Sequence, residues 1–278
     1  MRAVVLDSHG QPELTDVPTP APAAAVLACG LCGSDLEKLG AAPPGTVLGH
    51  EVVAQVDGRR LALIHHAPCG GCARCLAGHE STCEHFAAPT IVPGGFADWV
   101  LESEGVELDE SVSDAIGTYV EPLACVLRAL ERLPRGRVLV VGCGFVGRLF
   151  VEILRLRGDV VFALEPREDR RCAPEPDGPV DAAVLCAPAG GDDALARLEP
   201  GGTLLVFAPG GAIDLDLVYR RELALQGSRS ATPQHMEEAA ALLPALSLPE
   251  PLVLPLDRFA EGLERYRSGE ALKVVFTP

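Results

Sequence analysis

The segment PCGGCARCLAGHESTC holds four cysteines, Cys69, Cys72, Cys75 and Cys83. Two residues separate each of the first three, and seven separate the third from the last. Four thiolates in so short a segment can bind one Zn²⁺ in a tetrahedron, with each sulfur about 2.3 Å from the metal. The alternative is an accidental cluster of small core cysteines. The spacing favours a closed structural zinc site.

A second set of candidate ligands is spread along the chain. Cys32 lies in CGLCGSDLEK, His50 in LGHEVV and Glu121 in YVEPLACV. A sulfur, an imidazole and a carboxylate leave a fourth position open for substrate, which distinguishes a catalytic zinc from a closed one. Each residue alone also has a structural explanation, as a buried thiol, a loop histidine or a helix-start carboxylate. Their combination predicts a reactive metal site.

A glycine-rich turn lies in the segment RVLVVGCGFVGRLFVEILRLRG. Residues 137–141 predict a buried strand and residues 145–157 predict a helix. Gly142 and Gly144 lie between the two elements, and Gly147 lies in the first turn of the helix. The first glycine permits a tight turn, the second lets backbone approach a pyrophosphate, and the third allows close helix packing. The helix N-terminus would face the phosphates. This context predicts a dinucleotide site.

The next strand, VVFALE, ends in Glu165, 23 residues after Gly142 (165 − 142). A carboxylate there accepts hydrogen bonds from both ribose hydroxyls and repels a 2′-phosphate, which favours NAD over NADP. Arg167, Arg170 and Arg171 follow and could soften this preference, although Arg167 and Arg171 could equally form a solvated charge cluster. The candidate cofactor-binding residues are Gly142, Gly144, Phe145, Val146, Gly147, Glu165 and Arg170.

Composition narrows the class of protein. The chain has 278 residues, 48% of them apolar, enough for one large domain or two modest ones. No apolar run approaches the roughly 20 residues of a membrane span, and we expect neither membrane association nor a signal peptide. The net charge of −16 disfavours nucleic-acid partners. Ten cysteines, several in metal-like spacing, suit a reducing cytoplasm.

Two kinds of segment must position these residues. The first hundred residues hold short β-like runs separated by turns, which predict a barrel-like β domain. These runs are RAVVLD, AVLACG, VVAQVDG, RLALIHH and FADWVLE. A helical stretch over about 113–133 leads into alternating strands and helices up to about 245, typical of a parallel α/β sheet. The tail predicts one amphipathic helix and a closing strand.

The motifs CGLCGSD, GHE, the four-cysteine segment, PGGFADWV, EPLACV, GCGFVG and ALKVVFTP occur in this order. Over nearly its whole length the chain resembles the zinc-containing medium-chain alcohol dehydrogenases, close to the sorbitol and polyol branch. The resemblance implies a GroES-like β-barrel catalytic domain, residues 1–110 plus 248–278, and a Rossmann-type doubly wound parallel sheet, residues 111–247. It also implies two zinc ions per chain, a nicotinamide cofactor, and a homodimer or homotetramer.

The resemblance also assigns residue roles. The cysteine before GSD, here Cys32 and not Cys29, binds the catalytic zinc together with His50. Glu121 is a direct or water-bridged third ligand, and Glu51 is a carboxylate that can approach the metal.

Further roles follow from the same motifs. Asp35 orients the histidine, and Ser34 passes the substrate proton toward solvent. Lys273 corresponds to a basic residue that reaches the pyrophosphate, or else it is a surface lysine. The strand ends at 186–188 and 208–210 would touch the nicotinamide half of the cofactor.

The chain departs from the family in three places. Glu37 replaces a histidine that ends the proton path in many relatives, and the segment DGRRLALIHH is short. After Glu165 the segment PREDRRCAPEPDGPVDAAVLCAP lacks room for the usual second crossover helix and strand. We therefore predict five parallel strands where relatives have six. The cysteines outside the metal motifs are expected to fill core space, with redox use as the alternative.

The predicted function is NAD-dependent oxidation of a secondary alcohol, a polyol, sugar or cyclitol. One alternative is a biosynthetic ketone reductase that uses the same residues in the other direction. Another is a non-catalytic, zinc-stabilised binding or scaffold protein, which the shortened nucleotide-binding segment would favour. The complete open zinc site, with Ser34 and Asp35 beside it, favours an enzyme.

Overall fold

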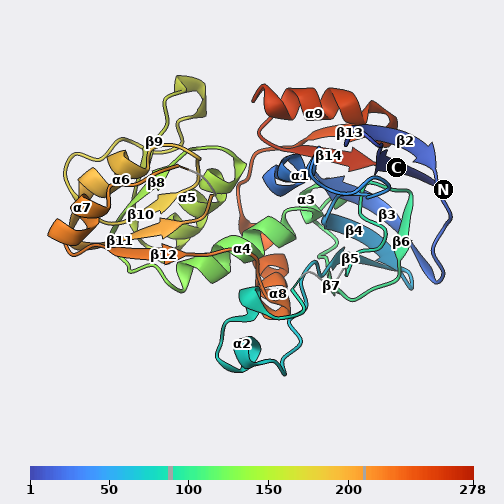
Figure 1. Ribbon diagram of the computed structural model, residues 1–278, viewed down its shortest axis with the longest axis horizontal. Helices are drawn as coiled ribbons and strands as arrows, with labels where there is room; N and C mark the ends of the chain where they lie inside the picture. Colours follow the sequence, from blue (N-terminus) through green and yellow to red (C-terminus); the bar gives the residue numbers. More distant parts are fainter. Residues whose placement is uncertain (87–89, 209–210) are drawn as a thin grey trace. The chain divides into compact units, whose positions relative to one another are not determined.

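The computed structural model describes residues 1–86, 90–208 and 211–278. The chain divides into two compact units, one made of Met1–Ala124 with Ala231–Pro278 and the other of Cys125–Ser230 (Figure 1). No helix of the described ranges is long and apolar enough to cross a membrane.

The boundaries expected from sequence, 110/111 and 247/248, fall inside the first unit. Two helices that the sequence pattern assigned to the nucleotide-binding domain pack on strands of the first unit. The helix α3 (Asp114–Gly117) contacts β3 (Ala23–Gly30) and β4 (Glu51–Val56), and α8 (Pro233–Leu242) contacts β7 (Gly105–Glu107). The second unit therefore begins at residue 125 instead of 111 and ends at residue 230 instead of 247.

The first unit is mainly antiparallel β structure. Its strands are β1 (Arg2–Leu6), β2 (Pro12–Asp16), β3 (Ala23–Gly30), β4 (Glu51–Val56), β5 (Arg59–Leu63), β6 (Trp99–Leu101), β7 (Gly105–Glu107), β13 (Leu252–Pro255) and β14 (Val274–Thr277). A seven-stranded sheet has the order β13-β14-β3-β4-β5-β7, with β6 also paired to β3, and β1 and β2 form a separate pair. Among the described strands of this unit, β13 and β14 are the pair that runs in parallel.

Local sequence explains why these strands form. Along β3, every second side chain from Ala24 to Ala28 is buried, as expected for a sheet with one face on the core. The strands β4 and β5 are joined by the two residues Asp57 and Gly58, with φ of 48° and 77°. Such left-handed turns match the twist of a hairpin and favour Asp-Gly.

The helices of the first unit are short and lie at strand ends and in connections. They are α1 (Gly33–Lys38), α2 (Ala73–Leu76), α3, α8 and α9 (Phe259–Arg267), with 3₁₀ turns η1 (Glu80–Thr82), η3 (Leu243–Ala245) and η4 (Leu256–Arg258). The helix α4 (Val120–Leu130) begins in the first unit and ends in the second.

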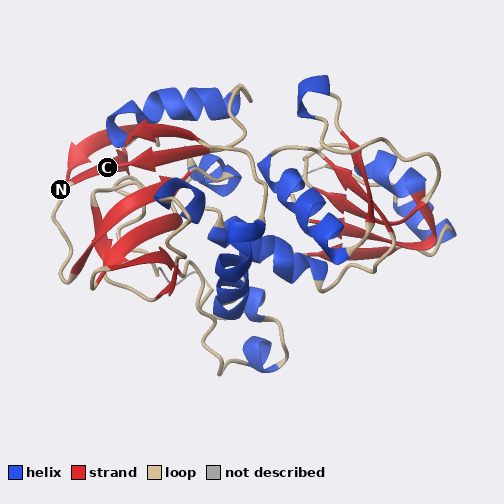
Figure 2. Cartoon of the chain, turned by 180° about the vertical axis from the view of Figure 1, so that it is seen from behind, coloured by secondary structure: helices blue, strands red, loops and turns tan. Residues whose placement is uncertain are grey.

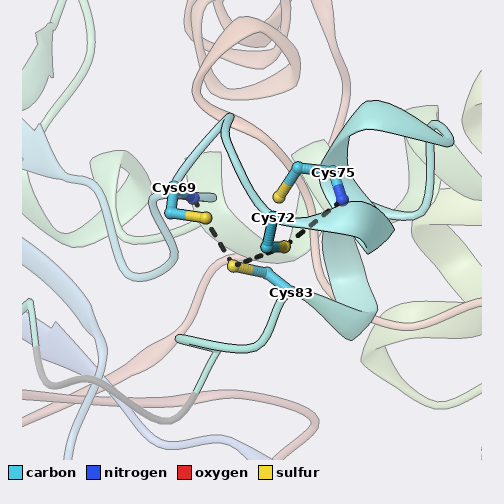
Figure 3. A group of neighbouring side chains, drawn as sticks. All are labelled: Cys69, Cys72, Cys75 and Cys83. Atoms are coloured by element: carbon cyan, nitrogen blue, oxygen red, sulfur yellow. Dashed lines mark hydrogen bonds between the residues drawn. The ribbon is translucent and has the colours of Figure 1, made fainter.

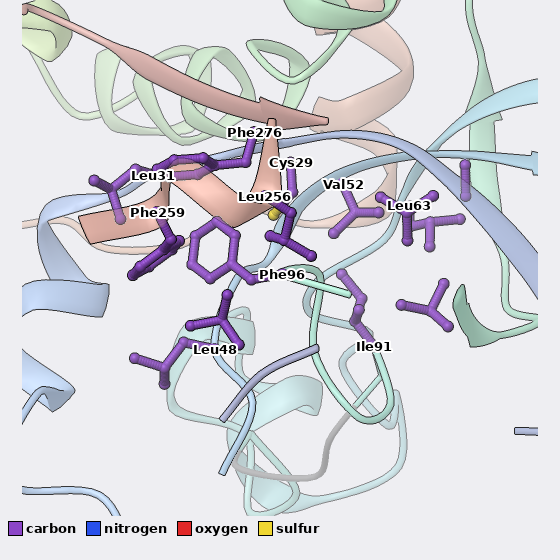
Figure 4. Close-up of a cluster of buried hydrophobic side chains, with 14 of the residues drawn as sticks. Cys29, Leu31, Leu48, Val52, Leu63, Ile91, Phe96, Leu256, Phe259 and Phe276 are labelled. Atoms are coloured by element: carbon purple, nitrogen blue, oxygen red, sulfur yellow. The ribbon is translucent and has the colours of Figure 1, made fainter. Parts of the chain in front are cut away.

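An aromatic trio joins the tail to the β domain. Phe96, Phe259 and Phe276 have ring centroids 4.6–5.6 Å apart and are all buried (Figure 4). Gly262 lets α9 approach this trio, because a Cβ there would lie 2.5 Å from the Phe276 ring. The predicted amphipathic helix and closing strand of the tail are thus confirmed as α9 and β14.

The second unit is a parallel α/β sheet, drawn in red between blue helices in Figure 2. Its strands are β8 (Arg137–Val141), β9 (Val160–Leu164), β10 (Val180–Leu185), β11 (Leu198–Val206) and β12 (Ala224–Gly227). Its helices are α5 (Phe145–Arg157), α6 (Gly191–Arg197) and α7 (Leu215–Arg220), with a 3₁₀ turn η2 (Glu168–Arg170). The order is β12-β11-β10-β8-β9, so the predicted five parallel strands are confirmed.

The shortened crossover leaves β9 at the edge of this sheet. After β9 the chain makes only η2 and a loop before it enters β10 on the other side of β8. The loop is tied back to the sheet, since Ala163 N donates to Pro174 O at 2.9 Å. Chain order therefore reverses at β8, and ligands of open α/β sheets bind outside the strand ends at such a point.

Candidate functional site

The four cysteines of residues 69–83 gather at one point. Their sulfurs all lie within 4.8 Å of one another, and the side chains converge in Figure 3. The Cys72 and Cys83 sulfurs are 4.0 Å apart. A tetrahedron with zinc–sulfur bonds of about 2.3 Å has sulfurs about 3.8 Å apart. The geometry fits a closed, structural zinc site.

Backbone groups favour thiolates in this cluster. Cys69 N and His85 N lie 3.5 Å and 3.3 Å from the Cys83 sulfur, and Cys75 N lies 3.5 Å from the Cys72 sulfur. The N–H groups of Glu84 and Cys75 lower the pKa of Cys72 to about 6, and that of Cys69 lowers the pKa of Cys83. Burial and Cys72 raise the pKa of Cys75 to about 12. Proton loss from such a cluster accompanies metal binding.

The second group of potential ligands comprises Cys32, His50 and Glu51. One ligand atom from each lies within 4.8 Å of the other two. Cys32 precedes α1, whereas His50 and Glu51 lie at the start of β4 and are buried. Sulfur, imidazole and carboxylate together form a donor set suited to zinc with a position left for substrate.

Asp35 organises this group from the first turn of α1. Its carboxylate accepts a hydrogen bond from Cys32 N at 3.1 Å and lies 3.3 Å from His50 Nδ1. Burial works against a charged His50, but Asp35 and Cys32 outweigh it and raise the pKa of His50 well above its ordinary value. His50 in turn lowers the pKa of Asp35 despite its burial. A carboxylate behind the imidazole fixes its orientation, as metal-bound histidines require.

Glu51 has an ion-pair partner that the sequence did not indicate. Lys273, only 3% exposed, pairs through Nζ with Glu51 Oε2 and donates to Leu31 O at 3.0 Å. Burial lowers the pKa of Lys273, but Glu51 outweighs it and the pKa is raised. The alternative of a surface lysine is therefore wrong. In this structure the ammonium group is directed at the carboxylate beside the metal ligands.

The other predicted residues are placed as follows. Ser34 Oγ lies 3.5 Å from Cys32 Sγ, and Glu37 is exposed on the same helix. Glu121 lies in the first turn of α4 and is not a member of the group formed by Cys32, His50 and Glu51. Cys29 is 1% exposed and belongs to the core cluster of the β domain.

His65 is a residue that the motif analysis missed. Its ring centroid lies 4.5 Å from that of His50. Burial, with the charges of His50 and Lys38, lowers its pKa to about 3. His65 follows β5 by two residues, at the carboxyl end of a strand paired with β4. The antiparallel pairing of β4 with β5 could have identified His65, because it brings a side chain that follows β5 near the start of β4.

The glycine turn has the form that a dinucleotide requires. Gly142 has φ of 92°, and a Cβ on Gly147 would lie 1.9 Å from Gly142 O. A Cβ on Gly144, in contrast, would meet no heavy atom within 4 Å. The turn therefore packs tightly on α5 while leaving open space at Gly144, where backbone could approach a pyrophosphate. Phe145 and Val146 begin α5.

Glu165 directly follows β9, and its carboxylate forms a hydrogen bond with the glycine turn. Its Oε2 accepts a hydrogen bond from Cys143 N at 2.8 Å, and its Oε1 accepts one from Arg167 N at 3.1 Å. Arg167 pairs with Asp169 at 2.8 Å, while Arg148 Nη2 donates to Arg170 O at 2.9 Å. The predicted strand-end residues begin at Cys186, whose backbone N donates to Val141 O at 2.9 Å. Of the other expected contacts, 209–210 lie outside the described residues.

Comparisons with known proteins identify relatives of this chain. The family described as the alcohol dehydrogenase GroES-like domain matches residues 24–106. The chain is 23% identical to sorbitol dehydrogenase of Halalkalibacterium halodurans over 100% of the chain and 99% of that protein. It is 23% identical to L-galactonate-5-dehydrogenase of Escherichia coli over 91% and 90% of the two chains.

Solved structures share the fold. A protein of Sinorhizobium meliloti 1021, described as a zinc-binding dehydrogenase and bound to NADP, superposes with a TM-score of 0.86 at 25% identity, covering 100% of this chain and 99% of that one. The matches cover both units and share their fold. Residues 24–106 match the alcohol dehydrogenase GroES-like domain, and over both units the chain is similar to the zinc-containing medium-chain alcohol dehydrogenases, a family of oxidoreductases.

Proposed function

We propose that this protein is a zinc-dependent dehydrogenase that transfers hydride between a secondary alcohol and NAD. The observation that carries the proposal is the convergence of Cys32, His50 and Glu51 within 4.8 Å, with Asp35 behind the histidine. A non-catalytic descendant would need the four-cysteine cluster for folding but would have no physical need for this open donor set.

The bound groups would supply the redox chemistry. Cys32 and His50 would hold a zinc ion, which would supply a Lewis acid for the alcohol oxygen, and a bound nicotinamide would supply the hydride acceptor. Ser34, beside Cys32, takes the alcohol proton and passes it toward solvent, by way of Glu37 or water. Glu51 is held by Lys273, so its approach to the metal requires the ion pair to loosen.

Glu121 is proposed as a further zinc ligand that acts directly or through water. The family resemblance supports it, although its carboxylate stands outside the group formed by Cys32, His50 and Glu51. Replacing Glu121 with Gln should lower kcat while zinc content stays close to that of the unaltered chain. A fall in zinc content as large as that of a Cys32 variant would make it a principal ligand instead.

A polyol, sugar or cyclitol is the proposed substrate class. The support comes from the two curated relatives, which are named for sorbitol and L-galactonate. The first experiment titrates the zinc-loaded chain with NADH and follows cofactor fluorescence. Saturable binding is expected, followed by turnover of one or more polyols in a screen that includes simple secondary alcohols. No binding at millimolar NADH would favour a non-catalytic protein.

We propose NAD as the preferred cofactor because Glu165 follows β9 directly and hydrogen-bonds to the glycine turn. A 2′-phosphate would meet this carboxylate, whereas ribose hydroxyls could donate to it. NADH should bind at least tenfold more tightly than NADPH, and Glu165→Gln should reduce that ratio. The exposed neighbour Glu168 provides the matched control, Glu168→Gln, which should leave the ratio unchanged. Equal or tighter NADPH binding by the unaltered chain would refute the preference.

We also propose a homodimer or homotetramer. The resemblance places the four-cysteine segment near subunit contacts, and Leu76 within it is 76% exposed. Light scattering at micromolar concentration should give a mass above one chain, and Leu76→Glu should lower it. A single-chain mass at all concentrations would exclude the proposal.

A further inference from the structure

His65 is a polar side chain beside the metal ligands to which the proposed reaction has so far given no role. Its ring centroid lies 4.5 Å from that of His50, and the two ring planes are inclined by 36°. Asp35 lies 3.3 Å from His50 Nδ1, which leaves His50 Nε2 for a metal ion. A molecule that binds to this ion would therefore arrive next to the His65 ring.

Contacts of the neighbouring chain hold His65 in this place. The Thr90 hydroxyl donates a hydrogen bond to His65 O. The next residue, His66, is buried, and its Nε2 lies 3.1 Å from Glu80 O in the four-cysteine segment. The two consecutive histidines thus contact different parts of the first unit. His66 contacts the four-cysteine segment, whereas His65 packs against a ligand of the reactive metal site.

The His65 ring is free to form hydrogen bonds. Within residues 1–86, 90–208 and 211–278, no hydrogen bond joins either of its nitrogens to another residue, and the side chain is only partly buried. Burial is the main cause that lowers its pKa to about 3, so the ring is neutral at pH 7. A neutral imidazole has one nitrogen that donates and one that accepts. A ligand can therefore both give a hydrogen bond to this ring and take one from it.

We propose that His65 is a specificity-determining residue that hydrogen-bonds a second hydroxyl of the substrate, on a carbon next to the reacting carbinol. This inference rests on the proposed dehydrogenase function and narrows its substrate to alcohols with neighbouring hydroxyls. A hydroxyl matches the neutral ring because it also donates and accepts. A simple secondary alcohol would leave the ring unpaired in a partly buried site, which weakens binding of its transition state.

Two other roles for His65 have different consequences. A fourth metal ligand would be expected to join Cys32, His50 and Glu51, but the group that these residues form does not include His65. A purely structural ring would need only its faces for stacking on His50, and not its nitrogens. His65→Phe keeps a ring that can stack and removes both nitrogens. His65→Gln removes the ring and keeps an amide that can donate and accept, so the two variants separate stacking from hydrogen bonding.

The first test compares 2,3-butanediol with 2-butanol as substrates of the zinc-loaded full chain with NAD. The two alcohols have the same carbon skeleton and differ by one hydroxyl. The unaltered chain should have the higher kcat/KM for the diol, and His65→Phe should reduce this preference about tenfold. His65→Gln should keep most of the preference. His9→Asn is the matched control, since His9 is an exposed histidine between β1 and β2, and it should leave the preference unchanged.

A second measurement needs no turnover. The ring ¹⁵N resonances of a histidine report which nitrogen holds the proton and whether it is hydrogen-bonded. The chain has seven histidines, and the His65 signals are those that disappear from the spectrum of zinc-loaded His65→Phe. Saturation with 2,3-butanediol should shift these signals in the unaltered chain, whereas 2-butanol at the same concentration should not. Where His65→Phe does not fold, His65→Gln supplies the assignment.

These measurements separate the inference from the proposed function. Turnover of both alcohols with an unchanged preference in His65→Phe would overturn the inference and leave the dehydrogenase in place. A shift of the His65 signals by the diol alone, without turnover of either alcohol, would refute the dehydrogenase and retain hydroxyl binding at His65. The inference is also overturned if the diol leaves the His65 signals unchanged, or if the zinc content of His65→Phe falls by one ion per chain, which would make His65 a metal ligand.

Discussion

Asp35 shows how a single side chain can organise the reactive site. It is 1% exposed, and its two oxygens are shared between Cys32 N, Gly49 N and His50 Nδ1. One carboxylate therefore fixes both the backbone of one metal ligand and the ring of another. The cost of burying its charge is offset by these partners, because an unpaired buried carboxylate would be strongly unfavourable.

The two metal sites should respond differently to loss of a cysteine. Cys72→Ser removes one of four ligands from a closed site and should lower folding yield and thermal stability, because structural zinc contributes folding free energy directly. Cys32→Ser should reduce turnover at least 100-fold while leaving the far-UV circular dichroism unchanged. Zinc content, measured by mass spectrometry, should fall by one ion per chain in each. Equal losses of stability would show that the sites are assigned wrongly.

Some residues of the site could not be read from motifs. Cys32 and His50 are brought together as expected, with Glu51 as the carboxylate beside them, because their motifs fix each one locally. His65 and the Glu51–Lys273 pair depend on strand pairing between distant segments, which spacing along the chain does not reveal. The position of Glu121 relative to the ligands depends on how α4 is oriented, and sequence does not determine this.

At the scale of elements, the strand–turn–helix from β8 to α5 depends on glycines with different roles. Gly147→Ala should destabilise the second unit by about 1–3 kcal/mol or more, because its Cβ would meet Gly142 O at 1.9 Å. Gly144→Ala should fold normally, since its Cβ meets nothing within 4 Å, but should weaken NADH binding at least tenfold. Thermal melts and NADH titration separate the two effects. Normal NADH affinity in Gly144→Ala would place the pyrophosphate elsewhere.

The strand β1 is joined to the segment before β6 by a charged contact. Asp98 accepts hydrogen bonds from Arg2 N at 2.6 Å and from Arg2 Nη2 at 2.8 Å. Burial raises the pKa of Asp98, but Arg2 outweighs it and the net shift is downward. A depressed pKa gives stability that is present above the unfolded value near 4 and is lost as pH falls through the folded value.

Asp98→Asn should therefore lower the free energy of unfolding by about 1 kcal/mol at pH 7. The difference from the unaltered chain should shrink below pH 4 and vanish near pH 2. Urea titrations over this range measure it, with Asp177→Asn as a control because Asp177 pairs with Arg137 in the other unit. A difference that persists at pH 2 would show a cause other than this ionisation.

Sequence pattern predicted most elements because apolar periodicity decides them locally. The strand 137–141 and helix 145–157 agree with β8 and α5. The strands β2, β7 and β13 were missed. β2 reads PELTD and has no fully buried side chain, and β7 has three residues, so neither has an alternating apolar pattern. β2 forms because β1, of the same length, supplies its hydrogen bonds, and β7 forms because the longer β5 does. The strand β13 pairs in parallel with β14.

At the scale of the whole molecule, the two units are proposed to bind different ligands. Each ligand should therefore change the thermal stability of its own unit. Chelation of zinc should lower the melting temperature of the unit Met1–Ala124 with Ala231–Pro278, which holds both metal sites. NADH at 100 times its Kd should stabilise the unit Cys125–Ser230 by about 2.7 kcal/mol. Differential scanning calorimetry with each treatment alone tests this. A shift with the chelator but none with NADH would count against a working cofactor site.

The burial of Lys273 limits what amine-reactive reagents can label. The chain has two lysines, and only Lys38 is exposed, at the end of α1. An N-hydroxysuccinimide ester at pH 8.5 should therefore attach one dye per chain at Lys38, apart from the N-terminus, and peptide mapping would verify it. Modification of Lys273 in folded protein would contradict its burial. Because α1 also holds Ser34 and Asp35, such a dye would provide an optical reporter of substrate arrival.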